Sequence, residues 1–313
     1  MRKKLILFLF ISSLFFLLGC VQDDDLVSGP FVGGSNGLEI GFVDDEPPDR
    51  VFDNNEEDFD IVIQIENVGE FDIPEGKVIT TLGKIPLRDF NIENENSKLD
   101  TDLNGKSEFN GKVIDGDIGE IVYQNVRYKH DLLADFETGV RADVCYLYQT
   151  KATTKVCLKQ KATERDLDDA CQINNDNVDI FNSGAPVQIS NVRTRSSGTN
   201  EVELTFQIEN KGSGRVYPPD AFANSCMKDE KKEDRLMVKV ITASGRHGVE
   251  CNSLGGKASG EIKLSNGIRF VRCDISTRNA LESATEEPVN IVVDYFYRNV
   301  IQKTLIVEDS EDN

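Results

Sequence analysis

The hexapeptide Gln64-Ile65-Glu66-Asn67-Val68-Gly69 recurs 143 residues later as Gln207-Ile208-Glu209-Asn210-Lys211-Gly212. Each copy ends an alternating apolar and polar run, and proline follows each within nine residues. A second match, Val144-Cys145-Tyr146-Leu147-Tyr148 against Val293-Asp294-Tyr295-Phe296-Tyr297, has an offset of 149 residues. Two matches in the same order and at nearly one offset indicate an internal duplication.

The alternation of period two extends along most of the chain, and no segment sustains an apolar helical stripe, so we expect an all-β protein. Asn-Gly and Asp-Gly pairs mark turns between the runs. About seven short strands in somewhat more than a hundred residues are typical of an immunoglobulin-like β-sandwich, so the duplication predicts two tandem sandwiches. The expected strands are 38–42, 59–66, 77–81, 119–123, 141–148, 154–158, 187–193, 201–209, 236–242, 260–264, 268–274, 289–297 and 302–307.

An alternating strand that runs into Glu-Asn-x-Gly and then a proline-containing segment resembles the CARDB-like and related immunoglobulin-like domains of prokaryotic, especially archaeal, surface proteins. The similarity covers most of residues 36–308. It extends to a group of uncharacterised archaeal surface lipoproteins through Gly37-Leu38-Glu39-Ile40-Gly41-Phe42, through 145–150 with Cys157, and through Gly184-Ala185-Pro186-Val187. The resemblance implies binding, adhesion or assembly outside the cell, and it implies no catalytic role, because this fold serves many functions.

The first twenty residues differ from the rest of the chain. Arg2-Lys3-Lys4 precedes an apolar run over 5–18 that is interrupted only by Ser12 and Ser13, which is typical of a signal peptide. The run closes with Leu17-Leu18-Gly19-Cys20, which resembles the lipobox of prokaryotic lipoproteins and identifies Cys20 as the lipidated residue. The alternatives are an ordinary signal peptide and an uncleaved N-terminal anchor, and each places the body outside the cytoplasm.

The domain organisation follows from these features and from changes in composition. We expect a signal peptide over 1–19, a flexible tether over 20–36, a first sandwich over 37–160, a polar linker over 161–183, a second sandwich over 184–308 and an acidic tail over 309–313. Glycine, serine and a run of three aspartates make the tether polar and flexible.

The chain of 313 residues is strongly acidic, with 55 acidic against 35 basic residues and a net charge of −20. Removal of 1–19 takes away three positive charges and leaves −23. Such a surface repels polyanions, so nucleic acid is excluded as a partner. Adaptation to salt or a need for solubility would also explain the acidity.

Six cysteines remain after Cys20, an even number that predicts disulfides in an exported protein. Cys145 and Cys157 flank the polar stretch 149–155, so a hairpin centred near Lys151 would bring them together. The remaining four could pair as Cys171–Cys226 and Cys251–Cys273, although six cysteines allow fifteen connectivities. Zinc is disfavoured because the spacing contains no C-x₂-C.

The catalytic candidates are few. Both histidines, His130 and His247, are expected in loops. The stretch 33–37 has the G-x-S-x-G pattern but lacks a preceding strand and a following helix, and Gly255-Gly256-Lys257 is only a fragment of a phosphate-binding loop. Asp294 interrupts an apolar strand, and its alternation favours an edge or outward position over catalysis. We therefore expect no catalytic residues and no enzyme.

No cofactor is expected, and calcium is the weak exception. Oxygen-rich loops at 44–46, 53–58 and 174–179 offer the hard ligands that calcium prefers, but none has the spacing of an EF-hand. Solvated acidic loops are the simpler interpretation, and we predict no metal site.

The sequence thus predicts a membrane-anchored extracytoplasmic lipoprotein with a non-catalytic role in binding, adhesion or envelope assembly. Its partners would be the membrane, through the lipid anchor, and an envelope or cell-surface protein or glycan. The alternatives are a surface hydrolase acting on polysaccharide, the solute-binding lipoprotein of a transporter and a purely structural spacer. The transporter alternative would require alternating strands and helices, which the sequence lacks.

Overall fold

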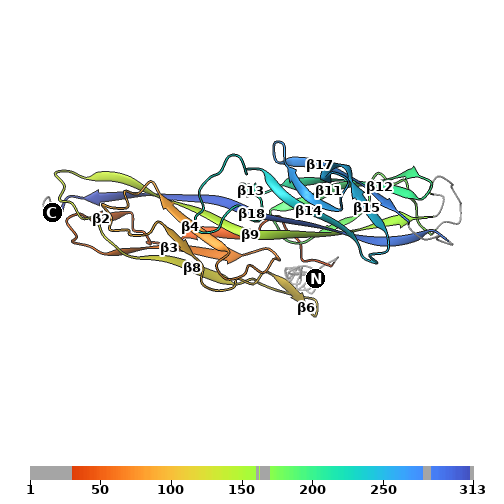
Figure 1. The fold of residues 1–313 in the computed structure, drawn as a ribbon. Helices are drawn as coiled ribbons and strands as arrows, with labels where there is room; N and C mark the ends of the chain where they lie inside the picture. The colour runs from red at the N-terminus through yellow and green to blue at the C-terminus, as the bar shows by residue number, and fades with distance from the viewer. Residues whose placement is uncertain (1–29, 160–161, 163–169, 278–282, 311–313) are drawn as a thin grey trace, which may run out of the picture.

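The computed structural model describes residues 30–159, 162, 170–277 and 283–310, which form one elongated body (Figure 1). The prediction of an all-β sandwich fold is confirmed: within these ranges the only helical element is the 3-10 turn η1 (Asn252–Leu254). No helix among them is long and apolar enough to cross a membrane. The predicted signal peptide, Cys20 and residues 311–313 lie outside the described part of the chain.

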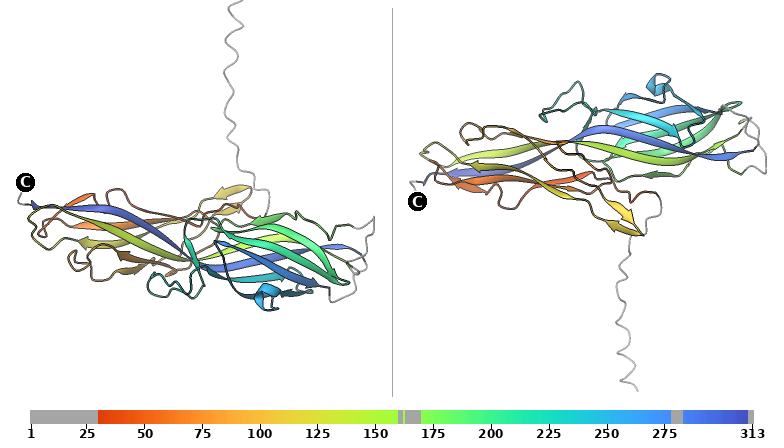
Figure 2. Two further views of the ribbon diagram at one scale, coloured as in Figure 1. Left: turned by 90° about the horizontal axis from the view of Figure 1, so that it is seen from above. Right: turned by 60° about the horizontal axis from the view of Figure 1, so that its bottom comes forward.

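Two exceptionally long strands form the axis of the body. β9 (Phe136–Leu158) and β18 (Thr285–Glu308) pair antiparallel in one unbroken register, from Phe136 opposite Val307 to Leu158 opposite Thr285. At about 3.3 Å per residue this ribbon is about 75 Å long. Both strands run through the two halves of the molecule side by side (Figures 1 and 2).

Each half is a sandwich that uses this ribbon as part of one layer. The nine-stranded central sheet has the order β16-β14-β18-β9-β4-β5, with β10 paired to β9 and with β13 and β2 paired to β18. The added strands are β2 (Arg50–Phe52), β4 (Val78–Gly83), β5 (Asn96–Lys98), β10 (Ile180–Asn182), β13 (Arg215–Tyr217), β14 (Arg235–Thr242) and β16 (Ser259–Lys263).

The second layer consists of two separate sheets. In the first half it has the order β1-β3-β8, and in the second half β11-β12-β17-β15. A two-stranded hairpin, β6-β7, forms a sheet of its own. The bounds are β1 (Leu38–Phe42), β3 (Phe59–Asn67), β6 (Ser107–Phe109), β7 (Lys112–Ile114), β8 (Ile118–Val126), β11 (Val187–Gly198), β12 (Glu201–Asn210), β15 (Gly248–Cys251) and β17 (Ile268–Ser276).

Alternation builds the core between the layers. In β3 the side chains of Phe59, Ile61, Ile63 and Ile65 are all buried, as expected for alternate positions on one face of a strand. One continuous cluster of buried residues extends through both halves. On the opposite face of the ribbon a smaller cluster gathers around the loop between β13 and β14, made of Ile79, Cys145, Tyr217, Phe222, Cys226 and Phe296.

The duplication is visible at the centre of the ribbon. Leu147 lies opposite Phe296, and Tyr146 lies opposite Tyr297, so the register places equivalent residues of the two repeats around a pseudo-two-fold axis. Four buried tyrosine rings from the two strands contact one another at centroid distances of 5.7–6.3 Å: Tyr146, Tyr148, Tyr295 and Tyr297.

The repeated asparagine binds the repeated tyrosine in each half. The Tyr148 hydroxyl donates to Asn67 Oδ1 at 3.1 Å, and the Tyr297 hydroxyl donates to Asn210 Oδ1 at 2.9 Å. Each asparagine Nδ2 also donates to the carbonyl oxygen four residues later, at 2.8 Å and 2.9 Å. Because a buried amide must be fully hydrogen-bonded, both sequence matches are parts of one interaction.

The repeated glycine makes room for the same tyrosine. A Cβ added at Gly69 would lie 2.0 Å from the Tyr148 hydroxyl, and one added at Gly212 would lie 2.3 Å from the Tyr297 hydroxyl. Neither glycine has a positive φ, so the requirement comes from close approach and not from backbone conformation.

The two halves are not consecutive, separable sandwiches as predicted. The last part of β18, which belongs to the expected second domain, pairs with the first part of β9 and with β2 in the first half. Conversely, β9 continues beyond Gln149 into the second half. The boundaries at 160 and 184 therefore do not separate two independent sets of strands.

The expected hairpin near Lys151 is absent because the polar stretch 149–155 stays in the strand. Its polar side chains have partners: Gln149 Nε2 donates to Asp294 Oδ1 at 2.6 Å, and Thr153 Oγ1 donates to Asn290 Oδ1 at 2.8 Å. Asp294 is consequently on a central strand between β9 and β14, and the expected edge position is wrong.

The disulfide pairing is corrected for the same reason. All six cysteines are bonded, but Cys145–Cys157 and Cys171–Cys226 are not formed, because β9 carries Cys145 and Cys157 to different regions of one extended strand. Only the prediction of Cys251–Cys273 is confirmed. The observed pairs are Cys145–Cys226, Cys157–Cys171 and Cys251–Cys273.

Parts of the predicted tether, linker and tail are bound to the body. The N–H groups of Val32 and Gly33 donate to the Glu70 carboxylate at 2.9 Å and 2.8 Å. β10 lies within the predicted linker, and the Ser310 N–H donates to Asp53 Oδ1 at 3.1 Å. The chain is thus fixed to the body from Val32 onward.

Candidate functional site

An open groove of about 720 Å³ lies in the second half, over the C-terminal part of β9. β9 contributes its floor, the start of β18 and β10 contribute its sides, and the segment after Cys171 closes one end. The lining residues are Pro30, Thr153, Thr154, Lys155, Cys157, Cys171, Gln172, Asn175, Asn177, Val178, Asp179, Phe181, Thr194, Glu286 and Pro288.

Covalent and ionic contacts define the walls of this groove. The Cys157–Cys171 disulfide joins the floor to the segment that closes the groove. Lys155 Nζ lies 3.0 Å from Glu286 Oε2, so the two charges on the neighbouring strands compensate each other at the surface. Phe181 is 41% exposed although it belongs to a strand, and it offers an apolar ring to the groove.

The polar loop of the groove is held in place by its own hydrogen bonds. The Asn175 N–H donates to the Thr194 carbonyl oxygen at 3.0 Å, and the Asn177 N–H donates to Asn175 Oδ1 at 2.9 Å. Thr154 Oγ1 donates to the carbonyl oxygen of Asp179 at 2.7 Å. The loop therefore presents a fixed set of amide and hydroxyl groups on a rigid strand.

The chemistry of the groove suits a neutral, polar ligand. Amide and hydroxyl groups beside an exposed aromatic ring can bind sugar hydroxyls or the backbone of an extended peptide. An isolated phosphate would require unpaired cations, and Lys155, the only basic side chain among the residues that line the groove, is already paired. The described residues contain no group of three or more His, Cys, Asp or Glu that could hold a metal ion.

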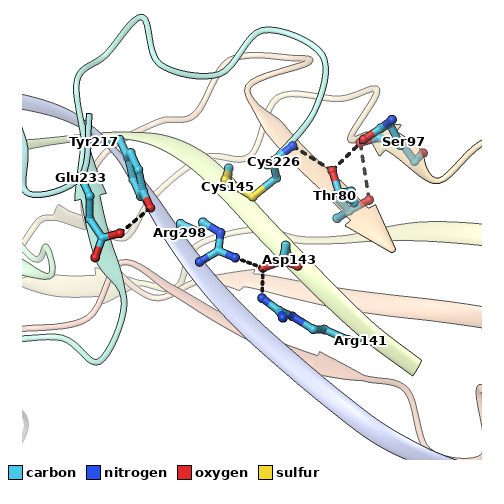
Figure 3. The surroundings of a disulfide bond; sticks show 11 residues. Thr80, Ser97, Arg141, Asp143, Cys145, Tyr217, Cys226, Glu233 and Arg298 are labelled. Carbon is cyan, nitrogen blue, oxygen red and sulfur yellow. Dashed lines mark hydrogen bonds and ion pairs between the residues drawn. A yellow bond between two sulfur atoms is a disulfide. The ribbon is translucent and has the colours of Figure 1, made fainter. Parts of the chain in front are cut away.

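A second polar cluster crosses the ribbon beside the Cys145–Cys226 disulfide (Figure 3). Arg141 and Arg298 both contact Asp143 Oδ1, and Arg141 Nη2 does so at 2.8 Å. Arg298 is only 9% exposed, so the carboxylate neutralises a buried charge. This cluster joins β9 to β18 and is best explained as structural.

The two histidines do not form a catalytic pair in the described structure. His130 lies at the surface, with Nε2 3.1 Å from Asp89 Oδ1. His247 is largely buried, contrary to the expected exposed loop, and its Nε2 lies 3.9 Å from Glu287 Oε2. The Glu287 carboxylate also accepts the N–H of Ser244 at 2.8 Å, so it has a structural role in this turn.

The two glycine-containing motifs also have structural roles. In the stretch 33–37 the Gly34 carbonyl oxygen accepts the N–H of Ala185, and β1 follows, so the strand-turn-helix context of a nucleophile is missing. Gly255 adopts φ 68° and ends η1, as a left-handed glycine commonly does after a helix.

The oxygen-rich loops proposed for calcium use their oxygens within the protein. Asp53 is buried and accepts the Leu132 N–H at 2.6 Å as well as that of Ser310. Burial alone would raise the pKa of Asp53, but the hydrogen bonds from Ser310 and Leu132 prevail and hold this pKa below its usual range. In the loop 174–179, Asp176 is paired with Arg195.

Sequence reasoning missed the groove. Its residues belong to the predicted linker, to the predicted hairpin and to the start of β18, which are distant in sequence. The one available signal is the apolar pair Ile180-Phe181 within the polar linker, which marks a short strand. Cys20, the other predicted site, lies outside the described residues.

A scan against protein-family models finds no match to this chain. A search of curated proteins likewise finds no significant match.

Proposed function

We propose that the protein is a lipid-anchored, extracytoplasmic binding protein of the cell envelope, with no catalytic role. The single observation that carries this proposal is the rigid groove over β9, which is open, polar and closed by the Cys157–Cys171 disulfide. A binding role requires a preformed surface, and the groove provides one.

The location is supported by the cysteine chemistry and by the N-terminal sequence. Three disulfides indicate an oxidising, extracytoplasmic environment. The apolar run over 5–18 followed by Gly19-Cys20 supports export and lipidation at Cys20. Cys20→Ser should therefore abolish lipid incorporation, and normal lipidation of this variant would contradict the assignment.

The ligand we propose is a neutral segment of an envelope glycan or of a neighbouring surface protein. The ring of Phe181 would pack against its apolar face, and the amides of Asn175 and Asn177 would bind its polar groups. A net charge of −23 without residues 1–19 would repel an acidic polymer, which favours neutral ligands.

The test is a photo-cross-linking residue placed at Phe181 in cells that produce the protein. A matched control carries the same residue at Phe270, which is 58% exposed on β17 and does not line the groove. We expect one reproducible adduct from position 181 and none of the same mass from position 270. Identical adducts, or none from position 181, would refute the groove as the binding site and would favour a structural spacer.

A further inference from the structure

The β6-β7 hairpin is an exposed apolar feature that the groove does not use. Its register pairs Ser107 with Ile114 and Phe109 with Lys112, and its turn, Asn110-Gly111, has positive φ at both residues. Every residue of the two strands is exposed. The hairpin projects from the body beside the first half (Figure 2).

One face of this hairpin is predominantly apolar. Residues that pair across strands share a face, so Phe109, Ile114 and Lys112 lie together, while Glu108 and Val113 lie on the other side. Phe109 is 66% exposed and Ile114 is 52% exposed. An isolated two-stranded sheet with a large exposed ring gains little stability from the remainder of the fold, and such a patch marks an interaction surface.

The patch continues onto the adjoining strand. Ile118 is exposed at the start of β8, and Val122 is exposed two positions after Glu120 on the same outward face. Five of the twelve large exposed hydrophobic residues in the described ranges therefore fall within 109–122. Their clustering distinguishes this patch from single apolar residues scattered over a surface.

The base of the hairpin is joined to the point where the chain enters the body. The Lys106 N–H donates to the Gly69 carbonyl oxygen at 2.6 Å. The next residue, Glu70, binds the N–H groups of Val32 and Gly33. Cys20 precedes Val32 by twelve residues, which span at most about 40 Å when fully extended. A lipid on Cys20 thus keeps this base within about 40 Å of the membrane, by the same chain-length limit.

The charge of the hairpin is compatible with a membrane surface. Between 106 and 115 the two basic residues, Lys106 and Lys112, balance the two acidic residues, Glu108 and Asp115. The remainder of the body carries the large negative charge, so the hairpin is a segment that can approach a bilayer with little repulsion.

From this juxtaposition we infer that Phe109 and Ile114 insert into the outer surface of the bilayer that holds Cys20. The inference rests on the proposed lipid anchor. The lipid and the hairpin provide two contacts with one membrane, which fix the orientation of the elongated body and the direction in which the groove faces.

The test exploits the absence of tryptophan from the sequence. Phe109→Trp introduces a single fluorescent probe at the hairpin, and Phe270→Trp introduces a matched probe on β17, which Figure 1 places on the opposite side of the body. Each full-length, lipidated variant is reconstituted into phosphatidylcholine vesicles with plain or brominated acyl chains. We expect bromolipid to reduce the Phe109→Trp emission at least twofold and to leave the Phe270→Trp emission unchanged.

Vesicle flotation separates the two levels of this reasoning. Variants that float while bromolipid fails to quench Phe109→Trp would overturn the hairpin inference and leave the lipid anchor intact. Variants that do not float would overturn the anchor and, with it, the inference. A blue shift without quenching that increases with protein concentration would show that a second copy covers the hairpin, which also overturns membrane insertion.

Discussion

The paired glycine and tyrosine positions at the centre of the ribbon give a quantitative test of the fold. A methyl group at residue 212 would lie 2.3 Å from the Tyr297 hydroxyl, and the next neighbours are at 3.1 Å or more. Over-packing of this kind costs about 1–3 kcal/mol. Because φ at this glycine is not positive, alanine recovers about 0.4–1 kcal/mol from the unfolded chain. We expect Gly212→Ala to lower the free energy of unfolding by about 2 kcal/mol at most, by the same over-packing range.

Removal of the tyrosine hydroxyl should relieve this clash. Tyr297→Phe alone leaves Asn210 Oδ1 and the Gly214 N–H without this partner, which costs about 1–3 kcal/mol. Gly212→Ala/Tyr297→Phe should then unfold within about 1 kcal/mol of Tyr297→Phe, because only over-packing by neighbours at ordinary or slightly tight distances remains.

The equivalent pair in the first half should behave differently. Cβ at residue 69 would meet the Gly184 carbonyl oxygen at 2.5 Å and that of Asn36 at 2.8 Å, in addition to the Tyr148 hydroxyl. Backbone atoms cannot be removed by Tyr148→Phe. We expect Gly69→Ala/Tyr148→Phe to remain about 2 kcal/mol or more below Tyr148→Phe, within the usual cost of over-packing.

The assay is equilibrium unfolding in denaturant with the disulfides intact, applied to the four single and two double variants. Equal relief in both halves would refute the assignment of the backbone contacts, and no relief at 212 would refute the contact with the Tyr297 hydroxyl.

Three further predictions follow from other contacts. Peptide mapping without reduction should yield Cys145–Cys226, Cys157–Cys171 and Cys251–Cys273, and a Cys145–Cys157 peptide would contradict the continuous strand β9. Burial raises the pKa of all seven tyrosines, to about 12 for Tyr123, Tyr217 and Tyr297, so native protein at pH 10 should show almost no phenolate absorbance. Only the unfolded chain then releases these protons, so stability should fall as the pH rises above 10. Asp143→Ala should cost about 3–5 kcal/mol because it leaves Arg298 buried without its carboxylate, and Asp143→Leu/Arg298→Met should cost less in the same unfolding assay.

The sequence was informative where one segment carries its own pattern. Alternation within β3 and β12 predicted both strands almost to their ends, and the repeated Asn67 and Asn210 indicated the duplication. It was misleading at 149–155, because polar residues there read as a turn. Their partners, Asp294 and Asn290, lie about 140 residues away along the chain, so no local pattern could reveal them. The incorrect cysteine pairing and the missed groove both follow from that single error.

The exchange of long strands predicts that neither half folds as a monomer. Residues 30–159 alone would expose the whole paired edge of β9, and residues 170–310 alone would expose that of β18. Two of the three disulfides also join a residue before 160 to a residue after 170. An unpaired apolar edge of this length promotes association, so the isolated first half should aggregate or pair with a second copy through β9.

Co-expression of the two halves should restore the fold, because the ribbon can form between chains. Size-exclusion chromatography should give a one-to-one complex, and non-reducing electrophoresis should show it to be covalent through Cys145–Cys226 and Cys157–Cys171. A monomeric first half with cooperative unfolding would contradict the argument. It would mean that β1, β3, β4 and β8 suffice to cover the first part of β9, so that the duplicated modules are independent despite their shared ribbon.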